Sequence, residues 1–259
     1  MHEIVIRFNV PKWTRLSRHD LSCDEGWLRN RIKIFELITL PSLRNQTTKD
    51  FGVLILINEK SPKWLIDYFS SLNGPDLALS AVPASSQEEG MEKASELVSI
   101  QCRSSGASHS LMTRLDSDDA LRKDAIAVLQ SNFEGQDGLA LDFPVIAALG
   151  LPPNEFLDKY SHPCGPFKTI ISRVDEGFKS ELYFRHSKLG EKYPVRSIQG
   201  GPFALQYIHG GNIANLRRGF PARDVNLDDF GIQHQIKTPY LVRCLKAAQR
   251  RMFRLFVRR

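Results

Sequence analysis

The sequence predicts an α/β fold with a mixed, mainly parallel sheet that is flanked by helices. Strand-like and helix-like runs alternate through the first half of the chain, which is the pattern of successive βαβ units. The run at residues 53–57 is apolar at every position, as is typical of a strand covered on both faces. At 259 residues, the chain is expected to form one domain around a large core, followed by a tail.

The first half contains seven predicted elements. Leu28, Ile32 and Phe35 share one face of a predicted helix, and Pro41 stands where this helix should end or bend. In order, the elements are a strand at 3–10, a helix at 27–40, a strand at 51–58, a helix at 62–72, a strand at 77–83, a helix at 88–103 and a strand at 108–115.

The second half has a less regular pattern, in which Pro and Gly are frequent. We expect a strand at 139–145, a break at Pro152-Pro153, and short strand-like pieces at 167–174, 182–186 and 204–209. This half is interpreted as an irregular extension that closes over one edge of the sheet and shapes a second pocket.

Three aspartates follow the last predicted strand of the first half. Asp116, Asp118 and Asp119 occupy three of four consecutive positions after an apolar run. Ionised carboxylates this close repel one another, and burying them costs several kcal/mol each unless a cation compensates. Oxygen ligands favour Mg²⁺ or Mn²⁺, and Mg²⁺ completes its shell with water and substrate phosphates. The alternative is that Asp118 or Asp119 caps a helix starting near Ala120.

The net charge of +6 is concentrated in the tail. Of the 35 lysines and arginines, eight lie in residues 236–259, which contain no acidic residue, so 27 basic residues face 29 acidic ones elsewhere. A near-neutral body argues against a nucleic-acid surface.

The tail is predicted to form one amphipathic helix from Tyr240 onward. Such a helix suits an anionic membrane surface, and the alternative is a terminal helix that packs on the domain or mediates dimerisation. The apolar face would carry Leu241, Leu245, Ala248, Met252, Leu255 and Phe256, and the basic face Arg243, Lys246, Arg250, Arg254 and Arg258.

The remaining composition indicates a cytoplasmic protein, or one attached peripherally at the inner face of the cell membrane. The start of the chain lacks a secretory signal pattern, and the longest apolar run is far below the roughly 20 residues that cross a bilayer. The four cysteines lie far apart without a C-x-x-C pair, so we expect reduced thiols.

Several common nucleotide-site motifs are absent. The sequence has no G-x-G-x-x-G after the first strand, no P-loop, no G-x-S-x-G elbow and no H-E-x-x-H. A bound nucleotide would therefore need its diphosphate neutralised by a metal rather than cradled by a glycine loop.

An ordered set of short segments carries a family resemblance. The segments are Ile6-Arg7-Phe8-Asn9-Val10, Trp27-Leu28 with Arg31 and Phe35-Glu36, Leu40-Pro41-Ser42-Leu43 with Gln46-Thr47 and Asp50-Phe51, Thr113-Arg114-Leu115-Asp116-Ser117-Asp118-Asp119-Ala120, and Ile208-His209-Gly210-Gly211-Asn212. Together they resemble the putative rhamnosyltransferase family of GT-A-like glycosyltransferases. The similarity spans roughly the whole chain before the tail.

The resemblance implies a metal-dependent transfer of a sugar, L-rhamnose in this family, from a nucleotide-diphosphate donor to a glycan or lipid-linked glycan. Asp116 and Asp118 match the D-x-D pair that holds Mn²⁺ or Mg²⁺ and the donor, with Asp119 beside them. Residues 1–235 would form the GT-A-like domain, with a donor-binding half at about 1–137 and an acceptor-side half at about 138–235, followed by the tail at 236–259.

Further polar residues are candidates for donor contacts. Arg7, Asn9 and Asn58 end the first two strands and face the same rim, where they contact the donor or are exposed loop residues. Arg114 precedes the aspartates and either pairs with Asp116 or reaches a phosphate. Arg31 could reach the diphosphate or lie solvated at a helix edge.

Three residues of the second half are candidates for the metal site and the catalytic base. His209 precedes a Gly-Gly turn and either completes the metal shell or is structural. Asp175 or Glu176 could take the acceptor proton in an inverting enzyme, although a solvated turn also explains the pair.

Two other function classes remain open at this stage. A metal-dependent phosphohydrolase or nucleotidyltransferase also uses clustered aspartates, and a non-catalytic sugar-binding module would need no metal.

Overall fold

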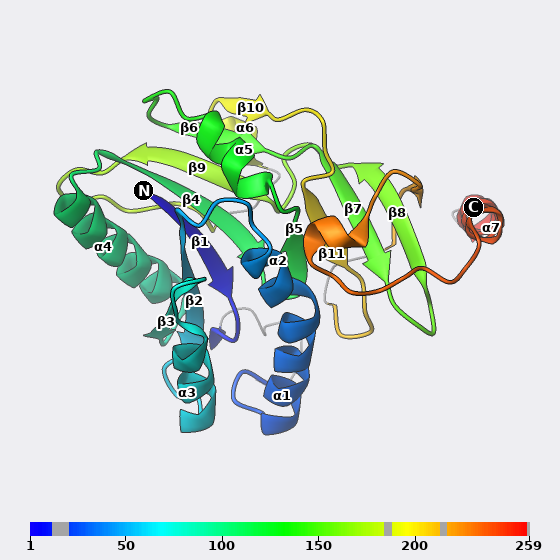
Figure 1. Ribbon diagram of the computed structural model, residues 1–259, viewed down its shortest axis with the longest axis horizontal. Coiled ribbons are helices and arrows are strands. Elements are labelled where there is room, and N and C mark those ends of the chain that lie inside the picture. Colours follow the sequence, from blue (N-terminus) through cyan, green and yellow to red (C-terminus); the bar gives the residue numbers. More distant parts are fainter. Residues whose placement is uncertain (12–20, 184–187, 213–216, 258–259) are drawn as a thin grey trace.

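The computed structural model describes residues 1–11, 21–183, 188–212 and 217–257, and contains two sheets side by side (Figure 1). The seven-stranded sheet runs in the order β10 (Val195–Ser197), β6 (Leu139–Asp142), β9 (Lys168–Arg173), β4 (His109–Asp116), β1 (His2–Arg7), β2 (Gly52–Asn58) and β3 (Ala78–Ala84). The five-stranded sheet runs in the order β12 (Phe220–Pro221), β8 (Phe156–Ser161), β7 (Val145–Gly150), β11 (Ala204–Tyr207) and β5 (Asp119–Leu121).

Helices cover both faces of the seven-stranded sheet. Apolar side chains of α1 (Glu25–Ile34), α3 (Lys63–Leu72) and α5 (Ala125–Ser131) pack with Ile4 and Ile6 on one face. Those of α4 (Gln87–Ser105) and α6 (Leu189–Lys192) pack with Val5 on the other, because successive strand residues point to opposite faces. β1 pairs in parallel with both β2 and β4. The predicted α/β fold with a mainly parallel sheet between helices is confirmed.

The first helix does not end at Pro41. It continues through a π-helical segment at Phe35–Thr39 into α2 (Leu40–Arg44), and Pro41 lies in the first turn of α2. At the junction the N–H of Leu40 donates to the carbonyl of Phe35, five residues back. The missing N–H of Pro41 costs little here because the wider turn has already shifted the hydrogen-bond pattern.

The second half is more regular than predicted. The pieces expected at 139–145, 167–174 and 204–209 contain β6, β9 and β11, whereas the β7–β8 hairpin was not predicted, and Pro152-Pro153 lies in its connection. Residues 182 and 183 form no strand, and residues 184–186 of the expected piece lie outside the described residues. The expected irregular extension instead adds β6, β9 and β10 to the seven-stranded sheet and supplies four strands of the five-stranded sheet.

A helix beginning near Ala120 is also wrong. Residues 119–121 form β5, which pairs antiparallel with β11, so that Asp119 lies opposite Gln206 and Leu121 opposite Ala204. The following helix, α5, begins only at Ala125. Pairing with a distant strand therefore overrides the local capping signal of the aspartates.

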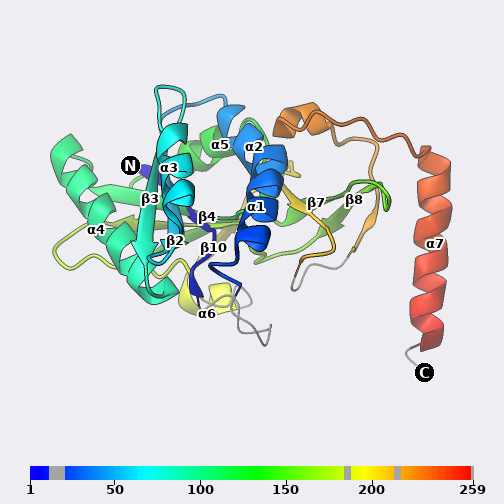
Figure 2. The same cartoon turned by 90° about the horizontal axis from the view of Figure 1, so that it is seen from below.

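The tail forms the helix α7 (Tyr240–Val257), which lies outermost beside the five-stranded sheet (Figures 1 and 2). A short 3₁₀ turn, η4 (Leu227–Phe230), precedes the strap, residues 231–239, which leads into α7. The side chains of Arg254, Leu255, Phe256 and Arg258 lie outside the described residues. Within the part of the chain that the structure describes, no helix is both long and apolar enough to cross a membrane.

Glu3 is a buried carboxyl in β1 that lies against the backbone of Gly52. A Cβ at Gly52 would lie 2.4 Å from its Oε2, so a side chain at residue 52 would require the Glu3 carboxyl to move. Burial, partly offset by the charge of the N-terminal amine, raises the pKa of Glu3 to about 7. Because the unfolded carboxyl titrates near its ordinary value, folding stability falls as pH rises from that value through pH 7.

We expect Glu3→Gln to raise the free energy of unfolding at pH 8 by up to roughly 3 kcal/mol, because an amide removes the cost of ionising a buried carboxyl. At pH 4 to 5 the two proteins should have nearly equal stability. Urea denaturation at both pH values measures this. Equal stability at pH 8 would show that Glu3 ionises in the fold without cost.

Candidate functional site

The three aspartates lie where the chain crosses from one sheet to the other. Asp116 is the last residue of β4 in the seven-stranded sheet, and Asp119 is the first residue of β5 in the five-stranded sheet. Ser117 and Asp118 form the crossing and are both buried. Arg7 ends the neighbouring parallel strand β1 directly opposite Asp116. The predicted cluster therefore lies at the carboxyl ends of parallel strands, where α/β folds bind ligands.

Asp116 is held by two arginines. Its Oδ1 accepts from Nη2 of Arg7 at 2.9 Å, and its Oδ2 accepts from Nη2 of Arg114 at 3.0 Å. Burial alone would raise the pKa of Asp116, but the charges of Arg114 and Arg7 outweigh it and hold the pKa well below its usual range. The Tyr183 ring covers the pair, with the Arg7 guanidinium 4.5 Å and that of Arg114 5.4 Å from its centre.

Asp118 lies at a different convergence of side chains. Its Oδ2 lies 3.2 Å from Nη1 of Arg31, 3.2 Å from Nε2 of His209 and 3.1 Å from Nδ2 of Asn212. Arg31 comes from α1 and also donates from Nε to Ser117 Oγ at 2.9 Å. His209 and Asn212 come from the turn after β11. Three distant parts of the sequence thus meet at one carboxylate.

The ring of His209 is oriented by its own turn. The N–H of Gly211 donates to Nδ1 of His209 at 3.1 Å, which places the imidazole proton on Nε2, facing Asp118. A glycine at 211 leaves this approach open, because a Cβ there would lie 3.2 Å from Cε1 of the ring. The turn at Gly210-Gly211 therefore positions the ring of His209.

Asp119 is buried and points elsewhere. Its Oδ1 accepts from the N–H of Tyr207 at 3.2 Å, and its Oδ2 has no hydrogen-bond partner among the described residues. Burial and the neighbouring charges of Asp118 and Asp116 raise the pKa of Asp119 well above its usual range. The raised pKa reflects the repulsion that a third ionised carboxylate would meet within the cluster.

Asn9 and Asn58 lie at the predicted rim, but they bind the protein itself. Nδ2 of Asn9 donates to Ser22 O at 2.6 Å and to Ser61 Oγ at 3.0 Å, and its Oδ1 accepts from the N–H of Asn58. Nδ2 of Asn58 donates to Ser22 Oγ at 2.9 Å, and its Oδ1 accepts from the N–H of Lys60. Both amides are used to tie the loop before α1 to the strand ends, which corrects the expected donor contacts.

The structure does not bring Asp175 and Glu176 to the aspartates. They follow β9, which runs antiparallel to β4 and pairs Arg173 with His109, the first residue of β4. β4 has eight residues, so this exposed turn lies about 23 Å along the strand from Asp116 at about 3.3 Å per residue. The expected position of a catalytic base is thus corrected: the pair is a solvated turn at the opposite end of the sheet.

Lys168, Tyr183 and Asn212 are site residues that the sequence did not single out. Lys168 is buried at the first position of β9, next to β4. Burial and the charges of Arg114 and Arg7 lower the pKa of Lys168 to about 7. Asn212 was visible as the last residue of the His-Gly-Gly-Asn turn, whereas Lys168 sits inside a strand pattern that carries no chemical signal.

The donor atoms at Asp118 fit a divalent cation that takes part of its shell from a substrate. Among the described residues, no group of three or more His, Cys, Asp or Glu side chains is arranged to hold a metal. Asp118 and His209 provide one oxygen and one nitrogen that face each other, and Asp116 is already paired with arginines. Such a set suits Mg²⁺ or Mn²⁺, which binds through few protein groups, water and phosphate oxygens.

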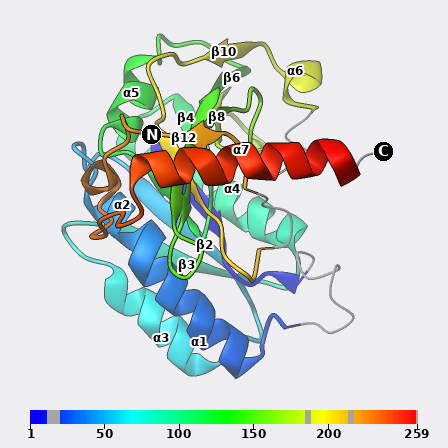
Figure 3. The same cartoon turned by 90° about the vertical axis from the view of Figure 1, so that its right-hand side faces the viewer.

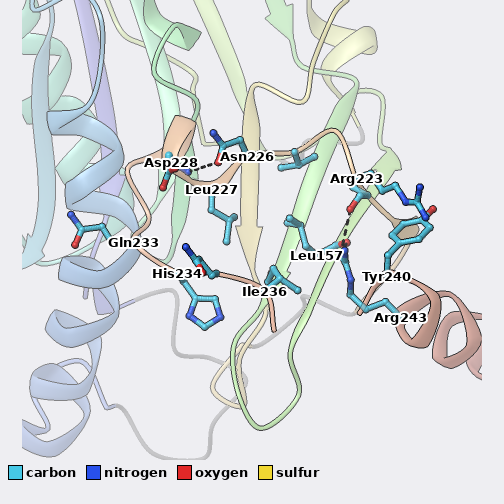
Figure 4. A pocket seen from close by; sticks show the side chains of 13 residues that line it. Leu157, Arg223, Asn226, Leu227, Asp228, Gln233, His234, Ile236, Tyr240 and Arg243 are labelled. Atoms are coloured by element: carbon cyan, nitrogen blue, oxygen red, sulfur yellow. Dashed lines mark hydrogen bonds between the residues drawn. The ribbon is translucent and has the colours of Figure 1, made fainter. Parts of the chain in front are cut away.

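A pocket of about 840 Å³ lies away from the aspartates (Figure 4). It is formed by β8, η4, the strap after η4 and the start of α7, with Leu157, Leu227, Ile236 and Tyr240 on its walls. Asp116, Asp118 and Asp119 do not line it, and neither do the residues that contact these three aspartates. Its position sets it apart from the site at the strand ends.

A comparison with known families gives a match over most of the chain. Residues 5–219 match the family model described as "Putative rhamnosyl transferase". No curated protein sequence matches the chain significantly.

Solved structures give distant likenesses. TarS of S. aureus has a TM-score of 0.40 and 13% identity over 80% of this chain and 36% of that chain. A "putative nucleotide-diphospho-sugar transferase" from Desulfovibrio desulfuricans G20 has a TM-score of 0.35 and 12% identity over 80% of each chain. The chain thus spans about a third of the length of the TarS structure.

The family match covers most of the chain, including the end of the first strand, all three aspartates and the His-Gly-Gly-Asn turn. It confirms the resemblance read from the ordered segments. The chain belongs to the "Putative rhamnosyl transferase" family of glycosyltransferases.

Proposed function

We propose that the chain is a metal-dependent glycosyltransferase that moves L-rhamnose from a nucleotide-diphosphate donor to a glycan or a lipid-linked glycan. The observation that carries the proposal is the convergence of Arg31, His209 and Asn212 on the carboxylate of Asp118 at the strand ends. The family supports sugar transfer, and the charges at this point are those that a diphosphate leaving group requires.

Asp118 and His209 are the residues that would hold Mn²⁺ or Mg²⁺. To ligate a cation through Nε2, His209 would carry its single imidazole proton on Nδ1 instead, and Nδ1 would no longer accept from the N–H of Gly211. When bound, the metal stabilises the negative charge that develops on the diphosphate as the bond to the sugar breaks. Asp119, which is buried and accepts from the N–H of Tyr207, would support the fold of this crossing rather than bind the metal.

Arg31 is positioned to serve the same charge. Its guanidinium donates to both Ser117 and Asp118. The Cζ atom of Arg31 lies 5.8 Å from the centre of the Trp27 ring. When a cation neutralises Asp118, the planar guanidinium can pair with a phosphate oxygen instead. An arginine at this place contributes most when the leaving group carries its full charge, which favours the transition state over the bound donor.

Arg7 and Arg114 act through Asp116. Their ion pairs fix the end of β4 against β1, so that Ser117 and Asp118 leave the strand in one direction. The two guanidinium groups face one carboxylate, which leaves a net positive charge beside the donor position. A donor diphosphate would be attracted to this region.

The first test is a thermal-shift measurement with nucleoside diphosphates, with and without Mn²⁺. A ligand that binds only the folded state raises the melting temperature, so the wild type should gain several degrees only when metal and nucleotide are both present. Asp118→Asn and His209→Ala should lose this metal-dependent gain. Asp175→Asn, a carboxylate change at the opposite end of the sheet, is the matched control and should behave as wild type.

Two results would contradict the proposal. One is an undiminished shift in excess chelator, and the other is a full metal-dependent shift in Asp118→Asn. Melting each variant without ligand separates a loss of binding from a loss of folding.

The second prediction distinguishes the roles of neighbouring aspartates. Asp116→Asn should lower the free energy of unfolding by about 3–5 kcal/mol, because it leaves Arg7 and Arg114 buried beside Lys168 without a countercharge. Denaturation in urea measures the loss. If Asp116→Asn is as stable as wild type, the ion pairs do not hold the strand end.

A further inference from the structure

The helix α7 is fixed to the domain by its basic side. It crosses the outside of the molecule beside β8 and β12 (Figures 2 and 3). The side chains that face the domain are Arg243, which is 8% exposed, and Ala247, which is 3% exposed. This arrangement is the reverse of the usual one, in which a terminal helix buries its apolar face.

Two arginines make this contact specific. Nη1 of Arg243 donates to Leu157 O at 3.0 Å (Figure 4) and to Ala222 O at 3.4 Å. Nη2 of Arg250 donates to Gly219 O at 3.2 Å and lies 3.4 Å from Oδ2 of the fully buried Asp158. Asp158 would be costly to bury without such cations, so the arginines fix the rotation of the helix about its axis.

The apolar side of α7 consequently faces away from the domain. Leu241, Leu245 and Met252 are 71%, 66% and 55% exposed, and their spacing places them on one helical face. At about 100° per residue this face lies roughly opposite Arg243 and Arg250. Of the eight exposed large apolar side chains among the described residues, four belong to this helix. A concentrated apolar stripe of this kind marks an interaction surface.

The charge of the segment selects the partner. Residues 236–259 contain eight basic residues and no acidic one, and Lys246 on α7 is exposed. A second copy of the chain would bring two such basic segments, without any acidic residue, close together, which opposes self-association. A lipid surface with anionic headgroups satisfies the stripe and the charge at once.

We propose that α7 docks on an anionic membrane surface, lying parallel to it with Leu241, Leu245 and Met252 inserted among the acyl chains. The clamp of Arg243 and Arg250 then holds the domain in one orientation above the lipid. This inference goes beyond the proposed sugar transfer and does not depend on it, because docking needs neither donor nor metal.

The test is co-sedimentation of the full chain with vesicles, in the absence of nucleotide and metal. Wild type should bind vesicles of mixed phosphatidylglycerol and phosphatidylcholine at least about tenfold more tightly than vesicles of phosphatidylcholine alone, and high salt should weaken the binding. Leu241→Gln/Leu245→Gln should bind the anionic vesicles about tenfold more weakly than wild type, since two apolar side chains no longer insert. Leu97→Gln/Ile100→Gln, which changes two exposed apolar side chains of α4, is the matched control and should bind as wild type does.

Three outcomes overturn the proposal. They are no binding of the wild type to anionic vesicles, equal binding by the wild type and the Leu241→Gln/Leu245→Gln variant, and a wild-type dimer that this variant converts to monomers. The last result, measured by analytical ultracentrifugation, would assign the stripe to a second copy of the chain. Thermal melting of each variant establishes that it is folded.

Discussion

The neutralisation of three carboxylates at the crossing between the two sheets is the constraint on which the site depends. Each carboxylate is accommodated differently: Asp116 by two arginines, Asp118 by an arginine, an imidazole and an amide, and Asp119 by a pKa raised well above its usual range. A single arrangement for all three would leave a buried charge without a partner, which costs several kcal/mol. Because the partners come from β1, β4, α1 and the turn after β11, the same interactions that make the aspartates tolerable also fix these elements to one another.

Asp116 and Asp118, two residues apart, therefore have different roles: Asp116 holds the fold, and Asp118 is the carboxylate proposed to bind a ligand. The pairs of Asp116 with Arg7 and Arg114 are covered by Tyr183, so exchanging them for a ligand would expose buried charge. The contacts of Asp118 are single hydrogen bonds near 3.2 Å to groups that bind cations or phosphates as readily as carboxylates. The proposed binding of a donor diphosphate with its metal at Asp118 would therefore leave the ion pairs of Asp116 in place.

The sequence predicted the first half well because its signals are local. Each strand there is followed by a helix that packs on the same sheet, and apolar runs such as 53–57 identify buried strands without knowledge of their partners. The second half depends on partners far apart in the chain, since β11 pairs with both β7 and β5, and β9 inserts between β4 and β6. No periodicity encodes such pairing. The same limit explains the amides of Asn9 and Asn58, because a polar residue at a strand end looks alike whether it meets a ligand or a loop.

In the tail, a buried charge reverses the orientation that amphipathicity alone would predict for the helix. Its periodicity defines an apolar and a basic face, and burial of apolar area alone would turn the apolar face inward. Asp158, fully buried on β8, is already paired with Arg217 and draws Arg250 of the helix as well, while Arg243 satisfies carbonyls at Leu157 and Ala222. Charge-assisted hydrogen bonds to buried acceptors are directional, whereas apolar contact is not, so the arginines decide the rotation of the helix. The apolar stripe then remains to be covered from outside, which is the physical basis for a partner that is at once apolar and anionic.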